Sequence, residues 1–409
     1  MELYDVRNQK NGIGRLFSII LILELFVNED ILIFGTYGNA SLIKLKFVVQ
    51  TISFILILLK NRIVEKTDSF YSFVFLSALI IISCVINTDI RAGYLFMIMI
   101  YMTVLLFLQR VHIDYVLEQV YQTMVVICAY SLFVYFLRAL FPGIMSFFPV
   151  IKNVSNTEFY FCGLANVIVH PGGLLRNYGP FREPGVFQMF IIVPLIYALF
   201  RRDKIEFKKV SILVLALVTT FSTTGYIAFI FLITAFLFHK DMSNKTTKYV
   251  LLATLFVLFL YLVFGTDLMY KQGYGSVFGK LFGGYESIST KARMASVLGN
   301  LKIFWTNPII GRGITFVDEY FPIMAQNTVG FMTRDNTNTV LIQLSRFGLP
   351  FVLIFISRYI QFFWNYISST RMTKFLLLCS FFVLTVGENL TYSFLMSLFL
   401  FVPNKMIKE

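Results

Sequence analysis

Charged residues are scarce in this chain of 409 residues. Only 14% of the residues are charged, whereas 57% are hydrophobic. A soluble domain has about 25% charged residues, so this composition excludes an ordinary soluble protein. It predicts instead an all-α polytopic membrane protein.

Histidine and cysteine are also rare. The three histidines are far apart, and there is no His-Glu-x-x-His motif or acidic triplet. The four cysteines show no short spacing between any two of them. These patterns do not support a metal site or a disulfide framework. We therefore expect a protein that works without a metal or any other cofactor.

Long apolar runs are abundant. Apolar stretches of about 15 to 25 residues are typical of transmembrane helices. Such stretches begin near Leu16, Leu42, Phe70, Ala92, Val120, Gly185, Lys209, Gly225, Tyr249, Thr339, Phe375 and Asn389. Those that begin at Lys209 and Gly225 are short enough to be half-spans or a hairpin. We expect about 11 to 12 transmembrane helices in one integral membrane domain, residues 1–409. The first run has no small-residue cleavage site, so we expect it to remain as an anchor.

The basic residues fall mainly in alternate connections between these runs. More than half of the 35 lysines and arginines lie in segments that would face inward, whereas the short outward loops contain only Arg91. By the positive-inside rule, both termini are predicted to be cytoplasmic. The net charge of +13 largely reflects this topology. Nucleic acid is not expected as a partner, because basic residues do not cluster with stacking aromatics in a polar segment.

Two segments are too long and too polar to be simple turns. They comprise residues 142–184 and 265–338, and the topology places both outside the cytoplasm. Loops longer than about 12 to 15 residues are usually functional or disordered. Both segments contain aromatic residues and periodic apolar positions, so we expect them to fold against the membrane.

The second of these loops contains a helical pattern. Apolar residues recur at helical spacing at Met294, Val297, Leu298, Leu301, Phe304 and Trp305. The pattern ends at Asn307-Pro308 and predicts an amphipathic helix at the interface. Lys291 and Arg293 fall in its first turn, where the helix dipole is already positive. A bound anion would compensate for this repulsion.

A second arginine-rich segment lies before the sixth apolar run. Arg176 and Arg182 sit near the membrane surface, and an arginine costs roughly 2.5 to 3.5 kcal/mol at a bilayer centre. Pro184 suits the first helical position, so Arg182 and Glu183 would flank a helix N-terminus. The simplest partner for charge held at this position is an anion.

A third such segment lies before the tenth run. Arg334 is followed by Asp335, Asn336 and Thr337, one of which would cap that helix. Three helix N-termini would then each have an arginine beside them, with Arg176 as a fourth. Backbone N–H groups and guanidinium groups together are suited to bind a diphosphate.

Ordinary structural roles compete with these interpretations. Arg182 could simply pair with Glu183, and Asp335 could be an ordinary helix cap. Arg312 between two glycines fits a solvated turn, and His170 fits a loop histidine. Tyr178 fits interfacial packing as well as stacking on a sugar ring. Glu388, near the end of an apolar run, would face the interface or the interior of the helix bundle.

Several motifs together resemble one family. They are Arg176-x-x-Gly179-x-Phe181-x-Glu183-Pro184, the Ser222-Thr223-Thr224-Gly225 turn, Arg293 ahead of Asn307-Pro308-Ile309-Ile310-Gly311, and Asp335-Asn336 leading to Ser345-Arg346-Phe347-Gly348. In this order and spacing they resemble the O-antigen polymerase and ligase superfamily of bacterial surface-polysaccharide enzymes. The resemblance covers roughly the second half of the chain and the first large loop. The first five apolar runs match only in being apolar.

The resemblance implies a GT-C-like glycosyltransferase in the bacterial inner membrane, with its active site facing the periplasm. Its donor would be an oligosaccharide on undecaprenyl diphosphate, used without a metal or a nucleotide sugar. Other implied partners are membrane lipids, a chain-length regulator and a flippase. Arg176, Arg182, Glu183, Arg293 and Asp335 are the expected catalytic residues, and Arg334, Asn336, Arg312, Tyr178 and His170 the expected substrate-binding residues.

Two departures from the family pattern favour a polymerase over a ligase. Family members that act as ligases tend to have a His-Asn pair where this chain has Asp335-Asn336, and an arginine is common in the turn that here reads Ser222-Thr223-Thr224-Gly225. A ligase that uses the same donor remains the alternative. A flippase or other transporter is less favoured, because the sequence shows no obvious internal repeat and no mid-span charge pairs.

Overall fold

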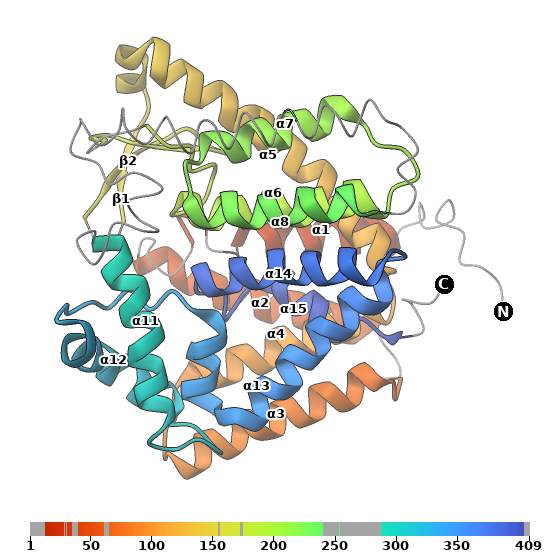
Figure 1. Ribbon diagram of the computed structural model, residues 1–409, viewed down its shortest axis with the longest axis vertical. Coiled ribbons are helices and arrows are strands. Elements are labelled where there is room, and N and C mark those ends of the chain that lie inside the picture. Colours follow the sequence, from red (N-terminus) through yellow and green to blue (C-terminus); the bar gives the residue numbers. More distant parts are fainter. Residues whose placement is uncertain are drawn as a thin grey trace.

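The computed structural model describes residues 13–27, 29, 31–34, 40–60, 65–153, 156–171, 175–239, 253 and 288–404. The apolar run predicted to begin near Tyr249, part of the second long loop and both predicted cytoplasmic termini lie outside these residues. Within them, the chain is mainly helical, with one small β-sheet (Figure 1).

The described residues form fourteen helices and three strands. The helices are α1 (Ile13–Val27), α2 (Ala40–Lys60), α3 (Asp68–Ile86), α4 (Ala92–Leu108), α5 (Ile113–Leu140), the 3₁₀ helix η2 (Pro142–Phe147), α6 (Pro184–Phe200), α7 (Phe207–Thr219), α8 (Thr223–Leu237), α11 (Ile288–Phe304), α12 (Gly313–Val329), α13 (Thr339–Tyr366), α14 (Arg371–Gly387) and α15 (Phe394–Phe401). The strands are β1 (Val150–Lys152), β2 (Glu158–Phe161) and β3 (Asn166–Ile168). Each predicted apolar run in the described part of the chain corresponds to one of these helices.

In the part of the chain that the structure describes, three helices are long and apolar enough to cross a membrane. They are α3, α5 and α13, and shorter apolar helices occupy Leu16–Val27, Ala92–Leu108, Pro184–Phe200 and Thr223–Leu237. The short runs predicted at Lys209 and Gly225 form α7 and α8, which are joined by a tight turn. The architecture is therefore mainly helical, with three candidate membrane spans by length and composition.

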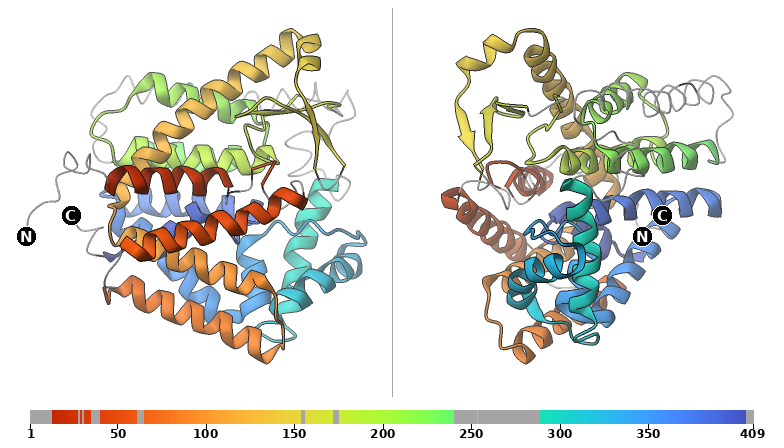
Figure 2. Two further views of the ribbon diagram at one scale, coloured as in Figure 1. Left: turned by 180° about the vertical axis from the view of Figure 1, so that it is seen from behind. Right: turned by 60° about the vertical axis from the view of Figure 1, so that its left-hand side comes forward.

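The two ends of this helix bundle differ in character. The helices α6, α8 and α14 run side by side, and the sheet and α11 lie at one of their ends (Figure 1). The view from behind in Figure 2 shows the same arrangement. At the opposite end, ion pairs join different helices: Arg201 pairs with Asp114 at 2.8 Å, and Arg358 pairs with Asp68 at 2.8 Å. Two of the basic residues that predicted the inward side, Arg201 and Arg358, thus lie at the end away from the sheet.

The small sheet is an element that the sequence did not predict. Its strands are antiparallel in the order β1-β2-β3, with Phe159 opposite Ile168. Strands of three or four residues are too short to produce a clear alternation of apolar and polar residues. The packing of Met145, Cys162 and Val167 against Val134 of α5 stabilises the sheet.

The predicted amphipathic helix forms as α11 and ends at Phe304, as expected. Its buried face is different from the predicted one, because Ala295, Asn300 and Ile303 are fully buried whereas Trp305 is 72% exposed just after the helix. The partner of that face is α12, which the sequence analysis did not predict. Close packing between two helices favours small residues, and a hydrophobicity pattern does not detect these.

The predicted cap of α13 was wrong. Neither Asp335, Asn336 nor Thr337 caps the helix; the side chain of Asn338 accepts a hydrogen bond from the N–H of Leu341 at 3.0 Å.

The reason lies in α11, which holds the residues before the cap. The N–H of Thr337 donates to Ser296 Oγ at 3.1 Å, and the Asn300 amide donates to Asn336 Oδ1 at 2.7 Å. These tertiary contacts hold the preceding segment in a non-helical conformation, so the helix begins one residue later.

The glycine-containing motif at residues 307–313 packs against the one at residues 345–348. The N–H of Arg312 donates to the carbonyl of Ser345 at 2.8 Å, and the N–H of Leu349 donates to the carbonyl of Pro308 at 2.8 Å. Gly348 has a φ of 81°, and a Cβ there would lie 2.1 Å from the Ile309 carbonyl oxygen. These motifs therefore join the α11–α12 unit to α13.

Candidate anion site

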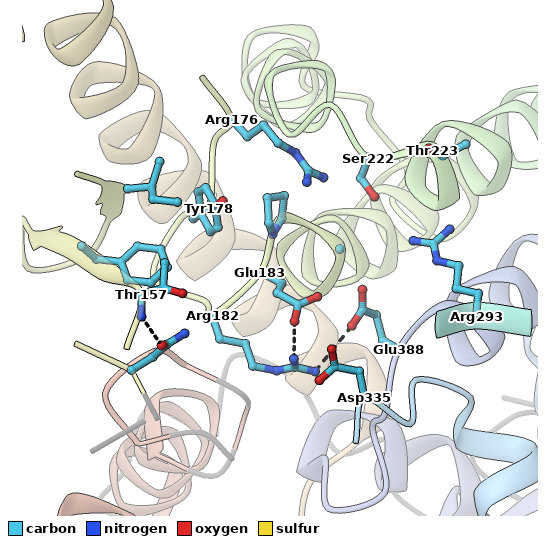
Figure 3. Close-up of a pocket in the computed structure, with 15 residues that line it drawn as sticks. Thr157, Arg176, Tyr178, Arg182, Glu183, Ser222, Thr223, Arg293, Asp335 and Glu388 are labelled. Atoms are coloured by element: carbon cyan, nitrogen blue, oxygen red, sulfur yellow. Dashed lines mark hydrogen bonds and ion pairs between the residues drawn. The ribbon is translucent and has the colours of Figure 1, made fainter. Parts of the chain in front are cut away.

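A polar cavity of about 380 Å³ lies where the ends of several helices meet the sheet. Its lining includes Arg176, Tyr178, Arg182, Glu183, Ser222, Thr223, Arg293, Asp335 and Glu388 (Figure 3). All five residues predicted to be catalytic are among them. The fold thus brings together residues that are widely separated in the sequence.

Four of the predicted substrate-binding residues do not line this cavity. His170 and Arg334 are exposed. The side chain of Asn336 is held by Asn300. Arg312 lies beside a different cavity, where its guanidinium stacks on Phe316 at 4.9 Å. Of the five, only Tyr178 lines the polar cavity.

Arg182 is buried and paired with two carboxylates. Its Nη1 lies 2.5 Å from Glu183 Oε1, and its Nη2 lies 3.6 Å from Glu388 Oε2. Arg182 is only 6% exposed and Glu388 only 3%. Arginine is suited to such pairing because its planar guanidinium can engage two acids at once. The guanidinium therefore orients both acids in the cavity wall, although its single charge can balance only one of them.

Glu388 is a site residue that the sequence analysis missed. Its burial confirms that it faces the bundle interior, one of the two expected environments. Gly185, in the first turn of α6, makes room for it, because a Cβ there would lie 1.8 Å from Glu388 Oε1. An acid after an apolar run is an ordinary feature of a sequence. Only the tertiary contact with Arg182 identifies its place in the site.

Arg176 is fixed against the turn between α7 and α8. Its Nε donates to the carbonyl of Thr220 at 2.9 Å, and the N–H of the next residue, Asn177, donates to the carbonyl of Thr219 at 2.9 Å. These bonds leave the terminal guanidinium nitrogens of Arg176 for other partners.

The surroundings of Arg176 disfavour its positive charge. Burial lowers the pKa of the Arg176 guanidinium, and the charge of Arg293 acts in the same direction, whereas Tyr178 and Glu183 oppose the shift. An arginine nevertheless stays protonated in a protein. An anion beside Arg176 would therefore offset an unfavourable local field.

Arg293 reaches the cavity from α11. Figure 3 shows its side chain extending from that helix toward Ser222 and Thr223. Within the described part of the chain, its guanidinium has no hydrogen-bond or ion-pair partner. Arg293 and Arg176 thus present guanidinium groups whose terminal nitrogens can bind an anion, in contrast to Arg182.

The N-terminus of α8 contributes to the same cavity. Ser222 is at the N-cap position, but its side chain makes no capping hydrogen bond. The preceding Phe221 has a φ of 47°, a left-handed conformation that costs about 1 to 3 kcal/mol in a non-glycine residue and is common at functional sites. The first N–H groups of a helix carry partial positive charge and bind anions readily.

Ser222 and Thr223 received no role from the sequence itself, although their turn was part of the family resemblance. A short polar break between two apolar helices was the available signal. Similarly, Asn153 and Thr157 line the cavity from the connection between β1 and β2. The N–H of Thr157 donates to Asn153 Oδ1 at 2.9 Å, which stabilises that connection.

The cavity therefore has two chemically distinct sides. One side consists of Arg176, Arg293 and the start of α8, and it is positive. The other contains Arg182 between Glu183 and Glu388, so the charge of this arginine is already engaged by acids. In the described residues, no group of histidine, cysteine, aspartate and glutamate side chains has the arrangement of a metal site.

Comparisons with protein-family models, with curated proteins and with solved structures found no match for this chain. The arguments for its function therefore rest on the cavity itself and on the motifs that line it.

Proposed function

We propose that this protein is an O-antigen polymerase, a glycosyltransferase that joins undecaprenyl-diphosphate-linked oligosaccharide units into polysaccharide at the periplasmic face of the bacterial inner membrane. The observation that carries the proposal is the convergence of Arg176, Arg293 and the N-terminus of α8 in one polar cavity. A diphosphate at the end of a membrane-embedded helix bundle is the ligand that this arrangement fits best.

The proposed reaction is a displacement at the anomeric carbon of the donor glycan. A hydroxyl of the acceptor repeat unit forms the new C–O bond, and the bond to the diphosphate oxygen breaks. Undecaprenyl diphosphate leaves with the bonding electron pair, and the hydroxyl proton passes to a carboxylate. Arg176 and Arg293 would stabilise the charge that develops on the leaving oxygen.

Asp335 and Glu183 are the acids suited to act on the acceptor. Asp335 lines the cavity and is exposed, and the side chain of Glu183 is 51% exposed despite its contact with Arg182. A general base must lie within hydrogen-bond reach of the acceptor hydroxyl. Glu388 is almost completely buried against Arg182, and we assign these two residues to positioning.

This assignment changes the role expected for Arg182. The sequence suggested that it binds the diphosphate together with Arg176 and Arg293. A guanidinium that already contacts two carboxylates has little net charge to offer an anion. In the proposed mechanism, Arg182 instead holds Glu183 at the N-terminus of α6.

The proposed topology has about 11 to 12 transmembrane helices, cytoplasmic termini and the cavity on the periplasmic side. Two features of α6 support this orientation. The helix begins at the cavity with Pro184 and ends next to Arg201 and Arg202, which belong to the basic end of the bundle.

The test is a silver-stained lipopolysaccharide gel of the source strain with this gene deleted and then restored. Loss of the ladder, leaving core plus a single repeat unit, is the expected result. Bare core with polymer accumulating on undecaprenyl diphosphate would instead identify a ligase. Bare core with single repeats trapped on the inner leaflet would identify a flippase.

A further inference from the structure

An apolar groove adjoins the polar cavity. It has a volume of about 490 Å³ and lies between α8 and α14, with α11 at one end. Ile227 and Phe231 of α8 and Cys379 and Val383 of α14 form its walls. The groove thus lies along two of the apolar helices of the bundle.

Arg293 connects the groove to the polar cavity, because its side chain lines both. The helices α8 and α14 also pass from the cavity to the groove at this position. Thr223 lines the cavity and Thr224 the groove, and likewise Gly387 lines the groove next to Glu388 in the cavity. One ligand with an anionic head and an apolar chain could therefore occupy both spaces.

The groove has a defined direction and depth. Its walls extend about 10 to 12 Å from the polar cavity, at a helical rise of 1.5 Å per residue. One wall follows α8 from Thr224 to Phe231, and the other follows α14 from Gly387 back to Cys379. Both helices run away from the polar cavity over this distance. The groove therefore leads away from the anion site along the apolar side chains of α8 and α14.

A polar group at the mouth of the groove also points to a ligand. Thr224 is 5% exposed, and its Oγ1 has no hydrogen-bond partner in the described part of the chain. A buried hydroxyl without a partner is energetically unfavourable. A phosphate oxygen next to Arg293 would accept its hydrogen bond.

We propose that this groove binds the first isoprenoid units of a polyprenyl diphosphate whose head group is held by Arg176 and Arg293. The inference rests on the proposed function, which supplies the diphosphate. An ordinary phospholipid has an anionic head as well, but the cavity combines the guanidinium groups of Arg176 and Arg293 with the N-terminus of α8. That arrangement matches the higher charge of a diphosphate.

Calorimetric titration of the purified protein in phospholipid nanodiscs tests the proposal, with empty nanodiscs as the blank. The probes are inorganic pyrophosphate and farnesyl diphosphate. Farnesyl diphosphate is expected to bind about tenfold or more tightly than pyrophosphate, because its chain is buried in the groove. Val383→Trp should fill the groove and remove this advantage while leaving the affinity for pyrophosphate unchanged.

Phe375→Trp is the matched control, because Phe375 is an exposed residue of α14 that does not line the groove. It should retain the full advantage of farnesyl diphosphate. Unchanged pyrophosphate binding in both variants also shows that each is folded.

Three results would overturn the proposal. Equal affinities for the two probes in the unmodified protein, or an advantage that survives Val383→Trp, would reject the groove while leaving the anion site intact. Phosphatidic acid competing as well as farnesyl diphosphate would show a general lipid surface. Failure of both probes to bind would reject the anion site, and with it the proposed function.

Discussion

Arg182 and Glu388 come from opposite halves of the chain, yet their side chains lie 3.6 Å apart in the wall of the polar cavity. Both are almost completely buried, and Glu183 contacts the same guanidinium. A buried ion pair is compensated only while both partners are present. Arg182 therefore differs in role from Arg176 and Arg293, whose terminal nitrogens face the open part of the cavity.

The first prediction concerns Arg293. Arg293→Ala should reduce polymer synthesis by about 10²- to 10³-fold, the usual effect of removing one preorganised group that stabilises developing charge. Protein abundance in the membrane should not change, since Arg293 has no partner among the described residues. The measurement is the rate of polymer formation from lipid-linked repeat units by the purified protein.

Arg312→Ala is the matched control for that experiment. Arg312 also carries a positive charge beside α11, but it lines a different cavity. Its replacement should leave the rate near that of the unmodified protein. Equal losses in both variants would show that general positive charge, and not the cavity, accounts for the effect.

The second prediction separates binding from positioning. Arg182→Ala leaves Glu388 buried without its cationic partner and should destabilise the fold by about 3 to 5 kcal/mol. Arg176→Ala should affect stability less, because it removes one hydrogen bond to a backbone carbonyl, worth about 1 kcal/mol. Thermal unfolding of the two detergent-solubilised variants measures the difference. The same melting temperature for both would contradict the positioning role of Arg182.

The third prediction concerns the glycine that faces Glu388. Gly185→Ala should displace the carboxylate and lower activity, because the new Cβ would lie 1.8 Å from Glu388 Oε1. The comparison is Gly143→Ala, where nothing lies within 4 Å of the added Cβ. We expect full activity in that variant. A Gly185→Ala protein as active as the Gly143→Ala protein would show that the position of Glu388 is unimportant.

The fourth prediction is an acid sensitivity of the α12 region. Burial alone would raise the pKa of Asp89, but hydrogen bonds from Thr315 and Tyr94 and the nearby Arg91 hold it below its ordinary value. A carboxyl group with a lowered folded-state pKa stabilises the fold above its unfolded-state pKa of about 3.9. That contribution is lost as the pH falls below about 4 toward the folded-state value.

Thermal unfolding measured between pH 7 and pH 3 tests this prediction against Asp89→Asn. The melting temperature of the unmodified protein should fall more steeply below pH 4 than that of the variant. The variant should already be less stable at pH 7, because the amide lacks the charge that strengthens the hydrogen bonds from Thr315. Parallel curves would exclude Asp89 as the source of the acid sensitivity.

Much of the site could be predicted because its arginines are conspicuous locally. Arg176 and Arg293 stand out in a chain with few charges, next to helix ends that apolar periodicity and Pro184 identify. Their convergence was a hypothesis from three similar helix starts. In the structure, both line one cavity, together with Asp335.

Other predictions failed where a tertiary contact overrides a local pattern. The hydrogen bonds from Ser296 and Asn300 move the start of α13 to Asn338. Arg312 resembled a site residue in sequence, but the packing of its turn on the Ser345 carbonyl directs it elsewhere. Short strands such as β1 leave no periodic signal at all.

The sequence by itself determined the class of this protein and the approximate ends of its helices, because transfer of apolar side chains out of water depends on local composition. The sequence also showed that Arg176 and Arg293 are charged residues beside predicted helix ends in an otherwise apolar chain. The tertiary structure alone decided which charges compensate one another. That decision depends on distances between residues remote in the chain, such as Arg182 and Glu388, and those distances are set by the packing of the helices. For the same reason, only the fold shows that Arg293 stands between a polar cavity and an apolar groove.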